Sequence, residues 1–363
     1  MTVRVDAEAP STTTRALWMD VLRGAAIFAV IVHHAVEALT WFDRSAPPIL
    51  WQLNNILSPF RMPMLIFLSG MLLGRSLQKP LRRFASGKLR RIAWPYVVWS
   101  LITVGMVGQL APGPLVRIAV QPELYTWYLW CLLLFYTVAF VLKKAPLWVL
   151  ASSCVVALGL ATTGFNVRPF YLWPFFIIGY WAALNPGIWR AIGRNRFVLP
   201  LLILITIGTS VASFLGIDIR FHPAYALLVL CAICVATASG FTVGDGRLAR
   251  TLVFVGSNSL IFYCIHYPVM IGAVLAVNAA GIRTAWVAFP IYIVAGTLGG
   301  FAATWMVRRW PKTRVAFELP PRRSANKVSK SWWERLPRIF RRGNRRKASG
   351  PRRALSRAAG STR

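Results

Sequence analysis

Five ionisable side chains lie in or next to an apolar run near the start of the chain. The run DVLRGAAIFAVIVHH is followed closely by a glutamate, and its ionisable residues are Asp20, Arg23, His33, His34 and Glu37. An α-helix turns by about 100° per residue, so Arg23 and His34 project from one face and are separated by about 16 Å along the axis. His33 projects roughly 100° away from that face. The face is predicted to read Asp, Arg, His, Glu along the helix.

These residue types can hold anions and transfer protons inside a membrane. Ionisable groups in spanning helices usually face a polar cavity or a partner, and they mark a functional path. A neutral imidazole can accept a proton from a hydroxyl group, which suits His34 as a general base. Glu37 could fix the tautomer of that imidazole. We therefore predict a functional role for His34, whereas a structural ion pair with Arg23 explains Asp20 equally well.

The composition is that of a polytopic membrane protein. The chain has 363 residues, of which 56% are hydrophobic and 14% are charged, whereas about a quarter of the residues in a soluble protein are charged. The charges are concentrated between long apolar runs, which predicts an all-α protein with about ten transmembrane helices. The predicted spans are residues 17–37, 51–74, 92–110, 125–142, 147–164, 169–184, 197–216, 221–241, 252–278 and 284–307.

The positive charges alternate between the two sides of this predicted bundle. Loops on the side of the N-terminus hold 14 Lys and Arg residues, whereas the opposite loops hold five. Cytoplasmic loops carry an excess of Lys and Arg, so both termini are predicted to be cytoplasmic. We therefore predict a multi-pass protein of the plasma (inner) membrane.

Three regions are predicted along the chain. Residues 1–16 form a cytoplasmic segment, residues 17–307 the membrane domain, and residues 308–363 a basic tail. The tail holds 19 Lys and Arg residues against two Glu residues, and this composition predicts disorder. Attraction to anionic membrane lipids, with KSWWERLPRIF at the interface, and a solvated tail that mainly fixes topology are equally consistent with it. Beside ten spans, the basic runs give little support to nucleic-acid binding.

The cysteines predict neither a metal site nor a disulfide framework. All five fall within apolar runs, including Cys231 and Cys234, which form a CxxC pattern. Buried thiols on a helix face explain this pattern far better than a metal or redox pair does. We therefore predict no metal.

Several motifs, in the expected order, resemble those of the acyltransferase family 3 membrane proteins. MDVLRGAAIFAVIVHH is similar to the first helix of that family, whose hallmark is an arginine and a histidine with ten residues between them, as in Arg23 and His34. FRMPMLIFLSGMLLGR resembles the second helix, and KLRRIAWPYVVW resembles the basic start of the third. TWYLWCLLLFY and SLIFYCIHYPV resemble the aromatic fourth helix and a late helix with Tyr-x-x-His. The resemblance spans residues 15 to about 307, and it fits the stand-alone form without an extra soluble domain.

This resemblance implies O-acyl transfer across the membrane. The donor would be a cytoplasmic acyl-CoA, usually acetyl-CoA, acting as a co-substrate and not as a tightly bound cofactor. The acceptor would be a hydroxyl of a carbohydrate or glycolipid at the outer side. His34 would be catalytic, assisted by Arg23 and Glu37. Both a base role for His34 and a transient acyl-carrying role stay open.

A dense basic cluster supplies candidates for binding CoA. Family members often carry RxxR at the start of the third helix, where this chain has Lys88 and Arg91, with Arg90 adjacent. Lysine offers a point charge without the bidentate fork of arginine. Lys88, Arg90, Arg91 and Arg23 are predicted to bind CoA, and the alternative is that the cluster only sets topology.

Further residues are predicted to bind the acceptor. These are Arg61 and Ser69 in the second predicted span, Tyr128 in the fourth and His266 in the ninth. A buried structural pair explains Arg61 equally well, and a satisfied core histidine explains His266 at least as well. An interfacial aromatic belt likewise explains the aromatic residues at the outer side.

Two other functions are consistent with these residues. A transporter or flippase would line a path for a polar solute with the intramembrane Arg and His, and a non-catalytic membrane subunit would dock a partner through its tail. The sequence shows no evident internal repeat, which is unlike the common repeat-built transporters. The Arg-x10-His spacing and the basic start of the third helix favour the acyltransferase, while the acceptor, the acyl group and the oligomeric state stay open.

Overall fold

The structure is a computed structural model that describes residues 12–41, 45–108, 113, 125–165, 167–240 and 246–320. Every regular element in these ranges is a helix, which confirms the all-α prediction. The helices are α1 (Thr12–Ala38), α2 (Pro48–Gly70), α3 (Leu73–Leu77), α4 (Leu81–Lys88), the π-helix η2 (Leu89–Ala93), α5 (Trp94–Met106), α7 (Trp127–Val141), η3 (Leu142–Lys144), α8 (Leu147–Ala161), α9 (Val167–Leu184), α10 (Pro186–Arg194), α11 (Val198–Phe214), η4 (Pro223–Tyr225), α12 (Ala226–Gly240), α13 (Arg247–Ser257), α14 (Ser259–Ala279), α15 (Ala285–Arg309) and the 3-10 helix η5 (Pro311–Ala316).

Four helical segments of the described chain are long and apolar enough to cross a membrane. They are Leu17–Ala38, Trp127–Lys144, Ser259–Ala279 and Ala285–Arg309, and α10 with α11 would supply a fifth that is bent by 77°. Helices α8 and α12 are apolar but have 15 residues each, or about 22 Å, whereas a hydrocarbon core is about 30 Å thick. Each predicted span coincides largely with a helix, while the count of ten spans and the cytoplasmic termini stay predictions.

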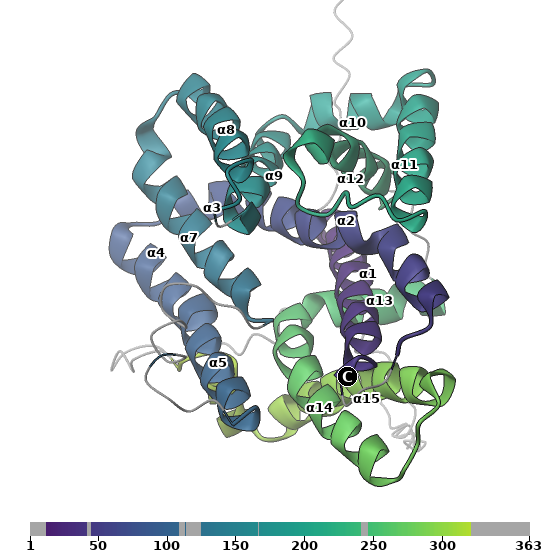
Figure 1. Cartoon of the computed structure of the whole chain (residues 1–363). Coiled ribbons are helices and arrows are strands. Elements are labelled where there is room, and N and C mark those ends of the chain that lie inside the picture. The colour runs from purple at the N-terminus through teal and green to yellow at the C-terminus, as the bar shows by residue number, and fades with distance from the viewer. Residues whose placement is uncertain are drawn as a thin grey trace, which may run out of the picture. The chain divides into compact units, whose positions relative to one another are not determined.

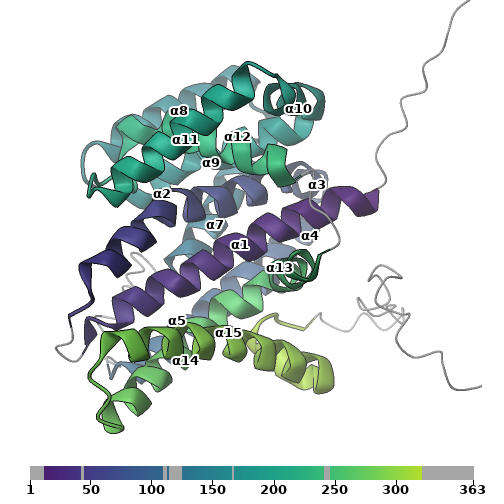
Figure 2. The same cartoon turned by 90° about the vertical axis from the view of Figure 1, so that its right-hand side faces the viewer.

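Helix α1 lies at the centre of the helices that carry the candidate residues. It packs against α2, α13, α14 and α15, and Figure 2 shows it between α2 on one side and α13, α14 and α15 on the other. Its apolar face is buried, with Ile27 2% exposed, Ile31 1% and Ala35 0%. Because α2 and α14 both lie against α1, side chains from these two helices meet the ionisable residues of α1.

The remaining helices extend from α2 as packed pairs. Helix α2 packs against α9 and α11, α8 packs against α9, and α11 packs against α12. Figure 1 shows these pairs on the far side of α2 from α14 and α15. Helix α2 therefore joins the part of the structure around α1 to the part around α9.

Two glycines allow helices α2 and α9 to approach closely. A Cβ atom at Gly70 of α2 would meet the backbone carbonyl oxygen of Phe176 in α9, and one at Gly179 of α9 would meet the carbonyl oxygen of Phe67 in α2. Helices in membranes gain little from the hydrophobic effect, so they depend on close packing of this kind, and small residues permit it. The α2–α9 contact therefore requires glycine on both helices.

The basic segment after α2 is helical, although the sequence analysis treats it as a loop. Helices α3 and α4 contain most of it, and the π-helix η2 continues directly from α4 into α5. The π-helix includes Arg90 and Arg91. A π-helical turn widens a helix locally and is frequent at functional sites. It therefore sets the direction in which the two arginines project.

The described chain also continues past the predicted end of the membrane domain at residue 307. Helix α15 ends at Arg309, and η5 then packs against α5. The indole of Trp94 donates to the carbonyl of Val315 (2.6 Å), and that of Trp99 donates to the carbonyl of Ala316 (2.9 Å). The expectation of disorder from residue 308 therefore does not hold for residues 308–320. KSWWERLPRIF lies outside the described residues.

Candidate functional site

The predicted pair of His34 and Glu37 is present near the end of α1. Nδ1 of His34 lies 2.7 Å from Oε2 of Glu37. An ionised carboxylate can only accept hydrogen bonds, so Nδ1 carries the hydrogen when Glu37 is charged. Nε2 of the neutral imidazole is then the nitrogen that can take up a proton. The pair has the arrangement of a general base held in one tautomer by a carboxylate.

Aromatic and imidazole rings from other helices surround His34. Its ring centroid lies 5.3 Å from that of His266 and 5.1 Å from that of Tyr267, both in α14. Tyr125 stacks on Tyr267 at 4.7 Å, and Trp41 approaches Tyr267 edge-on at 5.7 Å. Tyr267 is not among the residues predicted from the sequence, although it directly follows His266.

His266 is fully buried beside His34. Its Nδ1 donates to the carbonyl of Phe262 at 3.1 Å, while its Nε2 is buried without a hydrogen-bond partner among the described residues. A buried polar atom of this kind costs free energy unless something satisfies it. His266 is therefore not a fully satisfied core histidine.

Arg23 lies farther along α1, toward its N-terminal end. Its Nη1 is 3.7 Å from Oδ1 of Asp20, and its Nη2 donates to the carbonyl of Leu68 in α2 at 3.2 Å. The predicted Asp20–Arg23 pair is therefore present, and the same guanidinium group also anchors α1 to α2. Arg23 and His34 do not lie in direct contact, in agreement with their predicted separation of about 16 Å along the helix.

Ser69 and Tyr128 lie against each other between α2 and α7. The hydroxyl of Ser69 donates to the carbonyl of Leu65 (2.8 Å) and lies 3.3 Å from the hydroxyl of Tyr128. Tyr136 lies about two turns after Tyr128 along α7, and its hydroxyl donates to the carbonyl of Ser69 at 3.0 Å. The structure thus brings together two of the predicted acceptor residues and adds Tyr136, which the sequence analysis did not name.

Lys88 extends this arrangement to the basic segment. Its Nζ lies 3.0 Å from the ring centroid of Tyr136 and donates to the hydroxyl of Ser76 at 3.2 Å. Burial, together with the positive charges of Lys79 and Arg91, lowers the pKa of Lys88 to about 7. The amine is therefore poised to gain or lose its charge near neutral pH.

A continuous series of contacts joins Lys88 to His34. Tyr128 lies 5.3 Å from Tyr263, and Tyr263 lies 5.9 Å from His266, between ring centroids. We refer to this set as the Lys88–His34 series, and its members in order of contact are Lys88, Tyr136, Ser69, Tyr128, Tyr263, His266 and His34. Helices α4, α7, α2, α14 and α1 supply its members, so the fold and not sequence proximity brings them together.

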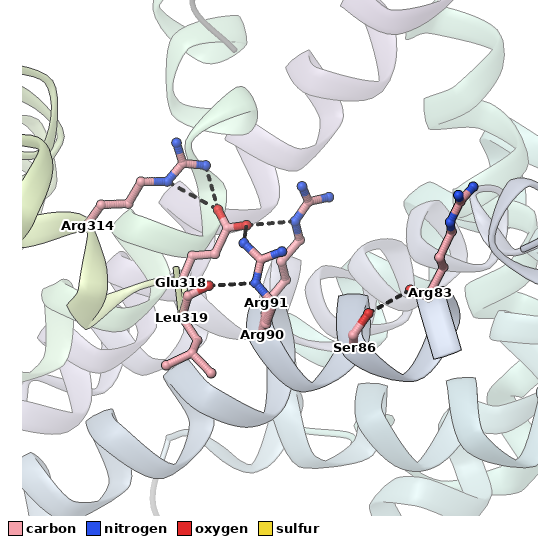
Figure 3. Close-up of polar contacts among 7 residues, drawn as sticks. All are labelled: Arg83, Ser86, Arg90, Arg91, Arg314, Glu318 and Leu319. Carbon is pink, nitrogen blue, oxygen red and sulfur yellow. Dashed lines mark hydrogen bonds and ion pairs between the residues drawn. The ribbon is translucent and has the colours of Figure 1, made fainter. Parts of the chain in front are cut away.

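The two arginines of the predicted CoA cluster bind the chain segment that follows α15. Figure 3 shows the carboxylate of Glu318 between Arg314 on one side and Arg90 and Arg91 on the other. Its Oε1 accepts from Arg91 at 3.0 Å and from Arg90 at 3.4 Å. Its Oε2 accepts from Nε of Arg314 at 3.2 Å, and Arg90 also donates to the carbonyl of Leu319 at 2.7 Å.

The ionised form of Glu318 is favoured in this position. Burial opposes its ionisation, but hydrogen bonds from Arg91 and Arg314 hold the pKa of the carboxyl group below its ordinary value. Three guanidinium groups therefore form a binding position for an anion that the chain itself supplies. Glu318 lies in the tail for which the composition predicts disorder, so this contact is not predictable from the sequence.

Arg61 is buried within α2. The side chain is 6% exposed, and its Nη1 donates to the amide oxygen of Asn54 at 3.4 Å. Glu37 attracts the guanidinium group electrostatically. Arg61 therefore belongs to the surroundings of the His34–Glu37 pair and not to those of Ser69 and Tyr128.

His33, His34 and Glu37 together hold three atoms of the kind that ligate metals. These atoms lie within 4.8 Å of one another. The positive charges of Arg61 and Arg220 act on both His33 and Glu37, and they disfavour a cation at this position. We therefore keep the prediction that no metal binds here.

Comparison with known proteins identifies the family. A family model described as an acyltransferase domain matches residues 16–305. No curated protein and no solved structure shows significant similarity to the chain. The match includes every residue of the Lys88–His34 series but not Glu318. The chain therefore belongs to the acyltransferase family 3 membrane proteins.

Proposed function

We propose that the protein transfers an acyl group, most simply acetyl, from cytoplasmic acyl-CoA to a hydroxyl of a carbohydrate-type acceptor at the outer side of the plasma (inner) membrane. The observation that carries the proposal is the Lys88–His34 series, which connects a basic cluster at one end to a carboxylate-paired histidine at the other. Its members have the chemistry that a charged thioester and a hydroxyl acceptor require. Ten spans with both termini in the cytoplasm would place the basic cluster on the donor side.

The donor's phosphate groups would bind at the basic end of the series. Lys88, Arg90, Arg91 and Arg314 offer charge-assisted hydrogen bonds, which are the strong contacts available to phosphate. The carboxylate of Glu318 holds three of these residues, so the donor would have to displace it. Arg23 lies farther along α1, where it would meet the part of the donor that enters the bundle.

The acyl-bearing arm would then follow the series toward His34. Ser69 and Tyr128 were predicted to contact the acceptor, but their position between Lys88 and His266 favours a contact with the donor arm. His266 lies next to His34, and its unpartnered Nε2 could accept a hydrogen bond from the acceptor hydroxyl, because Nδ1 carries the hydrogen of the ring. This arrangement would hold the acceptor hydroxyl near His34.

His34 would act as the general base of the transfer. Its Nε2 takes the proton of the acceptor hydroxyl as the hydroxyl oxygen attacks the thioester carbonyl carbon. The new C–O bond replaces the C–S bond, and the CoA thiolate that leaves receives the proton from His34. Glu37 keeps Nδ1 protonated and stabilises the imidazolium that forms in between. A route through an acyl-imidazole would use the same nitrogen and give the same products.

Release of free CoA thiol tests this proposal. The purified full-length protein is given acetyl-CoA with and without glycans extracted from the cell surface, and free thiol and acylated glycan are both measured. We expect thiol release that depends on the glycan and equals the acyl groups gained by it. A transporter or flippase would release no thiol, and that result would refute the proposed reaction.

A further inference from the structure

Three arginines interact electrostatically with the carboxylate of Glu37. They are Arg61 of α2, Arg168 of α9 and Arg220, which precedes α12. Glu37 attracts both Arg61 and Arg168, and Arg220 repels both. Interactions of this kind fall off with distance, so the three guanidinium groups act on the same carboxylate.

Arg168 and Arg220 each contact an aromatic ring. Cζ of Arg168 lies 5.0 Å from the ring centroid of Trp127, and Cζ of Arg220 lies 5.9 Å from that of Phe221. The rings of Trp127 and Phe221 meet edge-on at 5.8 Å. Arg168, Trp127, Phe221 and Arg220 therefore form one contiguous group, which we call the arginine–aromatic group. Contacts of this kind attract and orient a guanidinium group without neutralising its charge.

The backbone at Phe221 is strained in a way that fixes this group. Phe221 has φ = 58°, and it is the only residue other than glycine with positive φ in the described part of the chain. For a bulky side chain this conformation is unfavourable, and it persists where the surrounding contacts require it. The ring of Phe221 also packs edge-on against Tyr171 at 5.8 Å. The contacts of its ring with Trp127 and Tyr171 therefore hold Phe221 in this conformation.

The charges in this region do not balance. Arginine stays protonated in proteins. Arg61 is buried, and its hydrogen-bond partner Asn54 is neutral. Glu37 already accepts a hydrogen bond from His34. Three positive charges thus interact with one carboxylate that is itself engaged, and two of them, on Arg168 and Arg220, are exposed. The resulting positive potential favours an additional anion.

We propose that the acceptor carries an anionic group, either a carboxylate or a phosphate of the glycan, and that Arg61, Arg168 and Arg220 bind it beside His34. Guanidinium groups recognise both anions through paired hydrogen bonds. The aromatic rings of Trp127 and Phe221 would pack against the sugar that carries the anion. This inference rests on the proposed function, because it assigns the acceptor class of that reaction.

Binding measurements in the absence of any acyl donor test the inference. The full-length protein in detergent is titrated with a glucuronate-containing tetrasaccharide and with the same tetrasaccharide after reduction of its carboxyl groups. Glucose 1-phosphate and glucose form a second pair, which distinguishes phosphate from carboxylate recognition. The variants are Arg220→Gln and, as a matched control, Arg283→Gln, which changes an exposed arginine of another loop.

We expect one acidic probe to bind at least about tenfold more tightly than its neutral counterpart, since a hydrogen bond to a charged group contributes about 1.5–3 kcal/mol. Arg220→Gln should remove most of that preference, and Arg283→Gln should leave it intact. Equal binding within both pairs, or an unchanged preference in Arg220→Gln, would overturn the inference. A protein that shows the preference but transfers no acyl group would refute the proposed function alone, and one that acylates neutral glycans as readily as acidic ones would refute the inference alone.

Discussion

Among the single residues, the protonation states of His34 and Lys88 decide the proposed function. His34 is held by Glu37 at 2.7 Å, and this contact leaves Nε2 as the basic nitrogen. Lys88 lies over the ring of Tyr136, and burial lowers its pKa to about 7. The two residues stand at opposite ends of one series of contacts. Their protonation states would therefore control the binding of the donor and the transfer step separately.

The charge of Lys88 should make the binding of acyl-CoA depend on pH. The ammonium form predominates below about pH 7 and is lost as the pH rises above it, so the attraction to phosphate falls in that direction. We expect the affinity for acetyl-CoA, measured by titration of the purified protein, to fall by up to about tenfold between pH 6 and pH 8.5.

A lysine-to-arginine exchange provides the control for this dependence. Lys88→Arg keeps a positive charge throughout the range and should remove the loss of affinity, whereas Lys79→Arg, at an exposed position, should preserve it. The interpretation of Lys88 is wrong if both variants and the wild type show the same pH dependence.

The sequence predicts contacts within one helix better than contacts between helices. The pairs of Asp20 with Arg23 and of His34 with Glu37 are present because residues three apart are neighbours on any α-helix. The approach of His266 to His34 depends on how α14 packs against α1, which no spacing in the sequence encodes. For the same reason Ser69, Tyr128 and Lys88 were identified separately, but their contiguity was not.

At the scale of elements, hydropathy locates helices but not their breaks. Residues 252–278 read as one span, yet α13 ends at Ser257 and α14 begins at Ser259. The amide of Asn258 between them donates to the carbonyl of Phe254 at 2.7 Å, which satisfies the end of α13. Polar residues in a short Ser-Asn-Ser stretch change the mean hydropathy little, although they are enough to end a helix.

The average composition of the tail also does not predict the ordered segment after α15. Averaged over the basic tail, the charge pattern predicts disorder, and Glu318 is one of only two acidic residues there. The bonds from Trp94 and Trp99 and the ion pairs of Glu318 dock this segment against η2 and α5. One acidic residue among many basic ones thus has a local role that an average over the tail cannot show.

Removal of the Glu318 charge should strengthen donor binding. In the proposed function the carboxylate competes with CoA phosphate for Arg90, Arg91 and Arg314. Glu318→Gln weakens that competitor, so we expect the dissociation constant for acetyl-CoA to fall by roughly threefold to tenfold, because charged hydrogen bonds are about twice as strong as neutral ones.

The control for this prediction is Lys312→Gln, at an exposed position in the 3-10 helix η5 that precedes Glu318, and this variant should leave the affinity nearly unchanged. Apparent melting temperatures show whether each variant is folded. Weaker or unchanged donor binding in a folded Glu318→Gln protein would mean that Glu318 only anchors the segment and does not compete.

The close contact of α2 with α9 should tolerate no added methyl group. Gly70→Ala places a Cβ atom against the backbone of Phe176, so the two helices must separate, at a cost of about 1–3 kcal/mol. Gly159→Ala in α8 meets nothing within 4 Å and is the matched control. We expect a lower apparent melting temperature for Gly70→Ala alone. Equal melting temperatures for the two variants would show that the contact is looser than described.

At the scale of the whole molecule, the proposal needs the two ends of the Lys88–His34 series to face opposite sides of a membrane. Four to five helices of the described chain meet the length and hydropathy of a span. The apolar runs predict ten spans, and the loop charges alternate in agreement with that number, with 14 Lys and Arg residues on one side and five on the other. An even number of spans places both termini on the same side.

Reporter fusions test this topology. A fluorescent protein that matures only in the cytoplasm, fused to either end of the chain, should fluoresce in both fusions. An alkaline phosphatase fused after Gly113, in a predicted outer loop, should be active. A dark fusion at one terminus would require an odd number of spans, and it would place one end of the chain on the acceptor side.

In the proposed function His34 is the general base of acyl transfer, and a comparison of two histidine variants with the wild type tests this role. The purified full-length wild type, His34→Ala and His222→Ala are given radiolabelled acetyl-CoA and extracted surface glycans, and the label in the glycans is measured over time. His222 is exposed, and its ring contacts Tyr225 and not His34, so it controls for the loss of a histidine. Because a general base contributes about 10²–10⁴-fold to a rate, His34→Ala should lose at least about a hundredfold while His222→Ala keeps wild-type transfer. Normal transfer by a folded His34→Ala protein would contradict the account.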